Sequence, residues 1–321
     1  MPVYSPRLDC WYLTGPTAGG KTAVGLALAE QIGAEIASLD SMALYRGMDV
    51  GTAKPSADQR QRVPHHLIDL VDPWQVFSVA QYVEAAHRAA DAIHARGKIA
   101  LFVGGTPLYL KAMLRGLATG PTADWDTRHR LAEEARRFGP HVLHDRLAEV
   151  DPVAASRLHV NDVRRVIRAI EFYEQMGTPL SASQQQFDVA PSPDECHAWV
   201  LEWSVDELNR RIDARVDAMF AAGLVDEVRR LLAAEKPLSR TAVQALGYRE
   251  VAEHLAGKRD LDATRELVKT LTRRFAKRQR TWFRALPECR PLAAAEPLDP
   301  VATADRIAAA ERHPDTRHSE R

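Results

Sequence analysis

The chain has 321 residues, of which 45% are hydrophobic and 27% charged, typical of a globular protein with a sizeable core. Its 43 basic residues balance its 43 acidic ones, so a nucleic acid or membrane partner would need a local patch. Three widely spaced cysteines, Cys10, Cys196 and Cys289, exclude a dense disulfide framework and a CxxC metal site. Residues 1–9 carry no signal-peptide pattern and no apolar run approaches about 18 residues, so we expect a cytoplasmic protein without a membrane-spanning helix.

Short apolar runs alternate with helical patterns through the first 115 residues. We predict strands at residues 10–13, 35–39, 98–103 and, from a less regular pattern, 67–71. Helical spacing predicts helices at 21–32 and 79–96, which Gly33 and Gly97 are placed to end. Strands that alternate with helices in this order predict an α/β fold with a parallel sheet.

The pattern changes at residue 121, because no strand is evident from there to residue 193. Helices are predicted at 125–138, 141–150 and 162–176, followed by a returning strand at 196–203 and several helices up to residue 284. We therefore divide the chain into the first part of an α/β core (8–120), a helical insertion (121–195), a core completion with C-terminal basic helices (196–290), and a tail expected to be disordered (291–321).

A glycine-rich turn after the first strand matches the pattern G-x-x-x-x-G-K-[ST] and opens a helix, as that phosphate-binding motif requires. Its glycines let backbone N–H groups converge, and the helix N-terminus adds partial positive charge. Lys21 is expected to reach phosphate oxygens, and the Thr22 hydroxyl to hold Mg²⁺. The predicted diphosphate-binding residues of this turn are Gly15, Pro16, Thr17, Ala18, Gly19, Gly20, Lys21 and Thr22.

The ligand of this turn need not be ATP. Ordinary P-loop NTPases carry an apolar strand ending in Asp, which helps to hold Mg²⁺. The matching strand here, residues 99–103, is followed by Gly104-Gly105-Thr106. The missing carboxylate favours a ligand whose phosphate group leaves during the reaction.

Asp40 and Ser41 directly follow the second predicted strand. In a doubly wound sheet the carboxyl ends of the strands line the ligand crevice, so Asp40 is expected to face the same crevice as Lys21. There it would be a general base or a Mg²⁺ ligand. The alternative is a helix cap or turn residue, since Asp-Ser is common in both roles.

Five segments of the chain, 15–22, 40–55, 103–109, 247–249 and 276–283, lie between about residues 10 and 285. In these segments and in their order the chain resembles the tRNA dimethylallyltransferase (isopentenyl-tRNA transferase) family. Two positions depart from the family. Ala43 stands where many members have Gln, so a side-chain contact to the substrate base is expected to be absent or replaced. Arg164 also replaces a usual Gln, which favours an electrostatic contact there.

The resemblance implies a P-loop NTPase-like parallel sheet and a reaction in which dimethylallyl diphosphate alkylates the exocyclic amine of the adenine just 3′ of the tRNA anticodon. An adenine amine is a poor nucleophile, so its proton must be accepted as the new bond forms, and Asp40 is placed to accept it. Lys21 and Mg²⁺ would stabilise the departing diphosphate. Family roles add Thr106 at the acceptor and phosphate side and Arg215 as a diphosphate contact. The implied partners are dimethylallyl diphosphate and the tRNA anticodon stem-loop, with the protein expected to be a monomer.

Two basic regions could hold the tRNA. On a helix, Lys269, Arg273, Lys277, Arg280 and Arg284 form a stripe opposite Leu267, Leu271, Phe275 and Trp282, although an ordinary solvated face remains the alternative. A second cluster, Arg157, Arg164, Arg165 and Arg168, is opposed only by Asp162. Tyr45 and Tyr109 are candidates for stacking on the extruded adenine. The resemblance and these patterns together give the predicted tRNA-binding residues: Asp40, Ser41, Met42, Ala43, Thr106, Arg128, Arg164, Arg165, Val166, Ile167, Arg168, Gly247, Tyr248, Arg249, Lys277, Arg278 and Arg280.

Two alternatives remain open. A P-loop kinase of a small metabolite or nucleoside would use the same turn and core, but the Gly-Gly-Thr sequence and the two basic regions disfavour it. A non-enzymatic, nucleotide-dependent RNA-binding module is disfavoured by the acid expected beside the phosphate turn.

Overall fold

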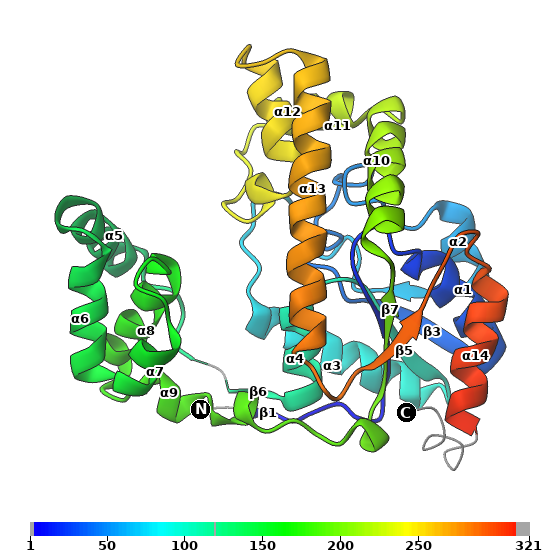
Figure 1. Ribbon diagram of the computed structural model, residues 1–321, viewed down its shortest axis with the longest axis horizontal. Coiled ribbons are helices and arrows are strands. Elements are labelled where there is room, and N and C mark those ends of the chain that lie inside the picture. Colours follow the sequence, from blue (N-terminus) through cyan, green and yellow to red (C-terminus); the bar gives the residue numbers. More distant parts are fainter. Residues whose placement is uncertain (1–2, 119, 313–321) are drawn as a thin grey trace. The chain divides into compact units, whose positions relative to one another are not determined.

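The computed structural model describes residues 3–118 and 120–312, which form two compact units (Figure 1). The core unit comprises residues 7–114 and the described part of 190–321. The helical unit comprises the described residues of 1–6 and 115–189. No helix in the described part of the chain is long and apolar enough to cross a membrane.

The core unit is built on a six-stranded sheet in which every pair of neighbours is parallel. The strand order is β4-β3-β5-β2-β7-β8, and the strands are β2 Trp11–Thr14, β3 Ala34–Ser38, β4 His65–His66, β5 Ile99–Val103, β7 His197–Glu202 and β8 Arg290–Ala293. The central strands read as continuous apolar runs because helices cover both faces of the sheet. This confirms the predicted α/β class with a parallel sheet.

Each face of the sheet packs on its own helices. Leu13, Leu101 and Leu201 share one face with buried side chains of α1 Lys21–Ile32 and α14 Pro300–Arg312. On the other face Tyr12 and Phe102 stack, near Tyr82 of α3 Val79–Ala95. The remaining helices of this half are α2 Ala57–Arg62 and α4 Pro107–Arg115. The β2–α1 turn therefore lies at the carboxyl ends of the central strands.

The C-terminal helices extend the core unit beyond the sheet (Figure 1). They are α10 Val205–Ala221, α11 Leu224–Leu232, η3 Ala242–Gln244, α12 Tyr248–Leu255 and α13 Leu261–Arg284. α13 packs along α10, and α11 packs on α12. Val216 and Val268 join α10 to α13 in a buried cluster that also contains Trp203, directly after β7.

The helical unit has its own apolar core, centred on Leu131, Leu143 and Ile170. Its helices are α5 Trp125–Phe138, α6 Pro140–Val150, α7 Pro152–Arg157, α8 Val163–Met176 and α9 Leu180–Ser183. The short η1 Gln185–Asp188 follows α9, and η2 Pro193–Glu195 precedes β7 in the core unit. The antiparallel strands β1 Val3–Tyr4 and β6 Leu117–Ala118 also belong to the helical unit. The unit thus begins earlier and ends earlier than the predicted insertion of 121–195.

Most predicted elements agree with the structure. The helix predicted at 125–138 and the helix at 21–32, ended by Gly33 with φ of 66°, have the observed bounds. The strand predicted at 67–71 is wrong, because the edge strand is β4 and only an isolated bridge joins Tyr45 to Val71.

The prediction of a disordered tail is wrong for residues 291–312. β8 adds the last strand to the sheet, and α14 packs on α1 through Ala304, Ile307 and Ala308, all buried. Small side chains supply most of this contact, so the segment does not have the high hydrophobicity by which a packed helix is usually recognised. Residues 313–321 of the predicted tail lie outside the described residues.

Candidate active site at the phosphate turn

A cavity of about 590 Å³ lies beside the turn between β2 and α1. Residues 17–22 of the turn line it, together with Asp40 after β3 and Gly104 and Gly105 after β5. α10 contributes Arg211 and Arg215, and α13 contributes Phe275 and Gln279. The predicted diphosphate-binding residues are therefore brought together, except that Gly15 and Pro16 do not line the cavity.

The carbonyl oxygens of the turn are engaged by donors from other elements. Trp203 Nε1 donates to Gly19 O at 3.1 Å, and Arg211 Nε donates to Ala18 O at 2.8 Å. Within the turn, Lys21 Nζ donates to Pro16 O at 2.7 Å. Holding the carbonyls in these bonds leaves backbone N–H groups at the start of α1 to meet an anion.

Lys21 and Arg215, both half-buried, bring positive charge to this cavity. Burial, together with repulsion from Arg215, lowers the pKa of the Lys21 ammonium to about 7, and attraction to Asp40 opposes this shift. Burial also lowers the pKa of Arg215, again opposed by Asp40. A bound anion would relieve both effects, so the cavity is electrostatically suited to a multiply charged ligand.

The Asp40 carboxylate is held in place by its own loop. Its Oδ1 accepts hydrogen bonds from the backbone N–H groups of Met42 at 2.8 Å and Ala43 at 3.2 Å. In residues 3–118 and 120–312 no hydrogen bond reaches Oδ2. Asp40 therefore has both of the roles considered from the sequence: its Oδ1 stabilises a turn, and its carboxylate lines the cavity. Its Oδ2 remains able to accept a proton.

Thr106 braces the same loop. Its Oγ1 accepts a hydrogen bond from Ser41 N at 3.0 Å, and its N–H donates to Leu39 O at 3.1 Å. Asp40 and Ala43 line the cavity, whereas Ser41, Met42 and Thr106 do not. Thr106 thus supports Asp40 through the backbone, and its predicted role at the acceptor stays a prediction.

The strand end without a carboxylate has a steric cause. A Cβ atom at Gly104 would lie 2.2 Å from Leu39 O, and one at Gly105 would lie 2.8 Å from Gln279 Nε2. Gln279 fills this space with two bonds, from its Nε2 to Gly105 O at 2.6 Å and from Thr17 N to its Oε1 at 2.8 Å. An acidic side chain at Gly104 would clash with the backbone of Leu39, and one at Gly105 would displace the Gln279 amide from its bonds to Thr17 N and Gly105 O. The metal ligand of ordinary P-loop ATPases is therefore disfavoured at both positions.

Two models of known families match the chain. The IPP transferase model covers residues 43–286, and the isopentenyl transferase model covers residues 8–71. The chain belongs to the IPP transferase family.

Members from several organisms are similar over most of the chain. A tRNA dimethylallyltransferase of Rhodopirellula baltica is 49% identical over 90% of this chain and 89% of its own, and one of Geobacter metallireducens is 50% identical over 84% and 87%. Among solved structures, the tRNA isopentenylpyrophosphate transferase of Bacillus halodurans is 35% identical, with a TM-score of 0.66 over 96% of this chain and all of that one. A eukaryotic dimethylallyltransferase acting on tRNA has a TM-score of 0.74 and 25% identity over 95% of this chain and 77% of its own.

Sequence reasoning missed a group of residues that shape this site and lie far from the phosphate turn in the sequence: Trp203, Arg211, Glu227, Gln279 and Glu296. The buried Glu227 carboxylate accepts backbone N–H bonds from Asp49 at 2.9 Å and Val50 at 2.8 Å, and so fixes the loop that leads to Thr52 and Lys54 in the cavity wall. Only the segment containing Gln279 carried a signal in the sequence, as part of a family motif.

Tyr248 does not fit its predicted contact with tRNA. Its side chain is 1% exposed and its hydroxyl donates to Glu227 at 2.6 Å, so it supports the loop from inside. Its neighbours Gly247 and Arg249 do not line the cavity, and Arg249 pairs with Glu250. Tyr45 and Tyr109 are also buried, and Tyr109 stacks on Tyr82 with ring centroids 3.7 Å apart, so neither ring is free to stack on a base in this structure.

The basic stripe predicted on α13 differs from the structure in the face that is buried and in the cations that ion pairs engage. The buried face is Thr264, Val268, Thr272, Ala276, Gln279 and Phe283, whereas Phe275 and Trp282 of the predicted apolar face are each 37% exposed. Lys269 and Arg273 pair with Asp217 and Asp213 of α10. The cations of this helix that no ion pair engages within the described chain are Arg274, Lys277, Arg278 and Arg280.

In the helical unit, buried Glu171 neutralises part of the predicted basic cluster. Its carboxylate binds Arg128 Nη2 at 2.9 Å and Arg168 Nη1 at 2.6 Å. The side chains of Val166 and Ile167 lie in the apolar core, and the predicted contact of these residues with tRNA stays a prediction. The exposed cations at this end of α8 are Arg164 and Arg165, the latter paired with Asp162.

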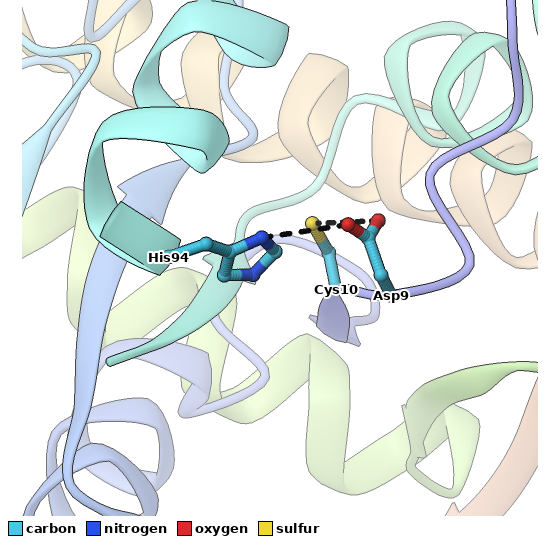
Figure 2. Close-up of side chains that lie close together, drawn as sticks. All are labelled: Asp9, Cys10 and His94. Atoms are coloured by element: carbon cyan, nitrogen blue, oxygen red, sulfur yellow. Dashed lines mark hydrogen bonds and ion pairs between the residues drawn. The ribbon is translucent and has the colours of Figure 1, made fainter. Parts of the chain in front are cut away.

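Outside the cavity, Asp9, Cys10 and His94 meet where β2 begins (Figure 2). Their potential ligand atoms all lie within 4.8 Å of one another. However, Arg7 donates to both Asp9 oxygens at 2.9 Å, and burial raises the pKa of the Cys10 thiol to about 12. The cluster already has its cation and holds a protonated thiol, so it is not suited to a metal ion.

Proposed function

We propose that this protein transfers a dimethylallyl group from dimethylallyl diphosphate to the exocyclic amine of the adenine just 3′ of a tRNA anticodon, and releases diphosphate. The observation that carries the proposal is one cavity lined by Asp40, the phosphate turn and the half-buried cations Lys21 and Arg215. Family membership and relatives named tRNA dimethylallyltransferase support the same reaction.

The reaction involves two changes of charge, one at the attacking amine and one at the leaving diphosphate, and different groups of the chain act on each. The adenine nitrogen attacks the first carbon of the dimethylallyl group as the bond from that carbon to the diphosphate oxygen breaks. The proton of the attacking amine passes to Asp40 Oδ2, which no other hydrogen bond engages in the described chain. The leaving diphosphate gains negative charge, which the N–H groups of the turn, Lys21 and Arg215 stabilise most at the transition state.

Mg²⁺ is part of the proposal. The cavity offers oxygen donors, the Thr22 hydroxyl and the Asp40 carboxylate, and hard oxygen ligands are those that Mg²⁺ prefers. Thr22, together with the oxygens of the diphosphate itself, would hold the ion. When bound, Mg²⁺ neutralises charge on the leaving group.

Two exposed basic surfaces are proposed to bind the tRNA backbone. The surface on α13 comprises the exposed Arg274, Lys277 and Arg278 with the half-buried Arg280, and the surface on α8 comprises the exposed Arg164 and Arg165. Because phosphate contacts release counterions, tRNA affinity should fall steeply as salt is added. We propose that a single copy of the chain carries both surfaces and acts as a monomer.

The test is to incubate the protein with tRNA and dimethylallyl diphosphate, in parallel with ATP, and to weigh the tRNA by mass spectrometry. A gain of one prenyl group that needs no ATP is the expected result. Digestion of the product should place the group on the adenine next to the anticodon. An unmodified tRNA, or phosphate transfer from ATP in its place, would contradict the proposal and favour the kinase alternative.

A further inference from the structure

A segment near the C-terminus lies against the phosphate turn. After β8, Ala294 N donates to Glu202 O at 2.8 Å, and the chain then reaches Glu296, which lines the cavity. Leu298 packs so closely on Gly20 that a Cβ atom there would lie 2.3 Å from its Cδ2. Because β8 fixes one end of this segment and α14 the other, Glu296 is held at the cavity by the fold rather than by a free loop.

Arg211 of α10 joins this segment to the turn. Its Nε donates to Ala18 O at 2.8 Å, and its guanidinium lies over the Trp203 ring at 4.3 Å from the ring centroid. Its Nη2 lies 3.4 Å from where a Gly20 Cβ would be, and its Nη1 pairs with Glu296. These contacts fix the guanidinium beside the first turn of α1, where the backbone N–H groups can bind an anion.

The Arg211–Glu296 pair is partly open to solvent, with side-chain exposures of 24% and 42%. An ion pair so placed is weak, and a carboxylate at its exposed end leaves at little cost. A diphosphate carries more charge than a carboxylate and offers the guanidinium the same paired-oxygen geometry. A ligand that enters the cavity therefore competes with Glu296 for Arg211 on favourable terms.

We propose that Glu296 is a resident anion, which occupies Arg211 until a diphosphate replaces it, and that Arg211 is a diphosphate-binding residue. The inference rests on the proposed function, since it takes the diphosphate as the ligand. Lys21, Arg211 and Arg215 are all half-buried and line the cavity, and Arg211 is the one of the three that an ion pair, with Glu296, engages within the described residues, so it is the cation for which a ligand must compete. Glu296 then keeps this cation paired and oriented while the cavity is empty.

The test measures binding of inorganic pyrophosphate to the full-length protein by isothermal titration calorimetry. Glu296→Gln should bind about two- to fivefold more tightly than wild type, the range expected for loss of one partly exposed competing ion pair. Arg211→Gln should bind at least about tenfold more weakly. Asp206→Asn, which removes an exposed carboxylate from the first turn of the same α10 helix, is the matched control and should not change the affinity.

A double mutant separates the pair from a general effect of charge. In an Arg211→Gln background, Glu296→Gln should have no further effect, because the group it competes for is gone. Equal tightening in both backgrounds would overturn the inference. Arg211→Lys, which keeps the charge, covers the case in which Arg211→Gln fails to fold, and in that background Glu296→Gln should still tighten binding.

The outcomes distinguish this inference from the function on which it rests. If the wild type does not bind pyrophosphate with or without Mg²⁺, the diphosphate itself is refuted as ligand, and the proposed function fails. If the wild type binds and modifies tRNA but Glu296→Gln binds no better, only the resident anion is refuted. In turnover, Glu296→Gln should lower KM for the diphosphate substrate and leave kcat unchanged, which a merely structural change would not do.

Discussion

Binding of the diphosphate substrate should weaken as pH rises above about 7, and Lys21 is the reason. In the free protein, burial and Arg215 lower the pKa of its ammonium to about 7. A bound diphosphate favours the charged form and raises that pKa, so binding takes up a proton wherever the free protein has lost it. Affinity is therefore full well below pH 7 and declines as pH rises through the pKa of Lys21 in the free protein.

The magnitude follows from the fraction of Lys21 that is protonated. With a pKa of about 7, half of the free protein carries the charge at pH 7 and about one part in a hundred at pH 9. If only the charged form binds, the apparent Kd for dimethylallyl diphosphate rises about 50-fold between these pH values. Calorimetry without tRNA, in buffers of different ionisation heat, measures both the affinity and the proton uptake.

Lys21→Arg supplies the matched control, because a guanidinium stays charged throughout this range. Its affinity should be nearly independent of pH, and any slope that remains reports titration of the ligand itself. Lys21→Met should bind weakly at every pH. A wild-type affinity that does not change between pH 7 and pH 9, or one that falls no more steeply than that of Lys21→Arg, would refute the reasoning.

Three further changes test other parts of the structure. Asp40→Asn keeps an oxygen that accepts from the N–H groups of Met42 and Ala43 but removes the base. Turnover should therefore fall about 10²–10⁴-fold, while the affinity for the diphosphate substrate stays near that of the wild type. Near-normal turnover would show that Asp40 is not the base. Ile307→Ala in α14 should lower the free energy of unfolding by about 2–5 kcal/mol in urea titrations, because the side chain is buried. Val301, on the same helix, is 56% exposed, so Val301→Ala should change that free energy little. Equal effects of the two substitutions would argue that this segment is disordered, as the sequence predicted. Lys277→Ala should reduce the slope of log tRNA affinity against log salt by about 1, and an unchanged slope would exclude α13 from the interface.

The elements that the sequence predicted well depend on neighbouring residues. The bounds of α1 and α5 follow from local signals. Gly33, in the left-handed region, ends α1, and the Asp124 side chain caps the N-terminus of α5. The turn and Asp40 could be placed in one crevice because parallel strands end at the same edge of a sheet. These inferences needed no knowledge of contacts between distant parts of the chain.

The buried face of α13 could not be predicted from hydrophobic spacing. Thr264, Thr272 and Gln279 are buried there, and the threonine hydroxyls donate to the carbonyls of Asp260 and Val268. Polar side chains that satisfy their hydrogen bonds inside the protein can replace apolar ones, and the apolar residues are then left on another face. The sequence predicted correctly that this segment is helical, but which face is buried depends on packing against α10.

The residues that shape the turn were missed for a related reason. Thr17 N meets Gln279 across 262 positions of sequence, and Gly19 O meets Trp203 across 184. A sequence pattern describes the turn itself but not the groups that hold its carbonyls. The steric role of Gly104 was also invisible, because it depends on the backbone of Leu39 in a neighbouring strand connection.

These distant contacts explain why the turn can serve a leaving group rather than an ATPase reaction. Lys21 and Arg215 repel each other across the cavity, and a bound anion adds to the attraction that Asp40 already gives to both. The attraction to the ligand grows as charge on the ligand grows, which happens when diphosphate departs and not when it first binds. Because Trp203, Arg211 and Gln279 already hold the turn, little reorganisation is needed at that moment. A carboxylate at Gly104 would clash with the backbone of Leu39, and Asp40 is the carboxylate that acts on both cations. Its Oδ2, which no hydrogen bond engages within residues 3–118 and 120–312, suits it to take a proton.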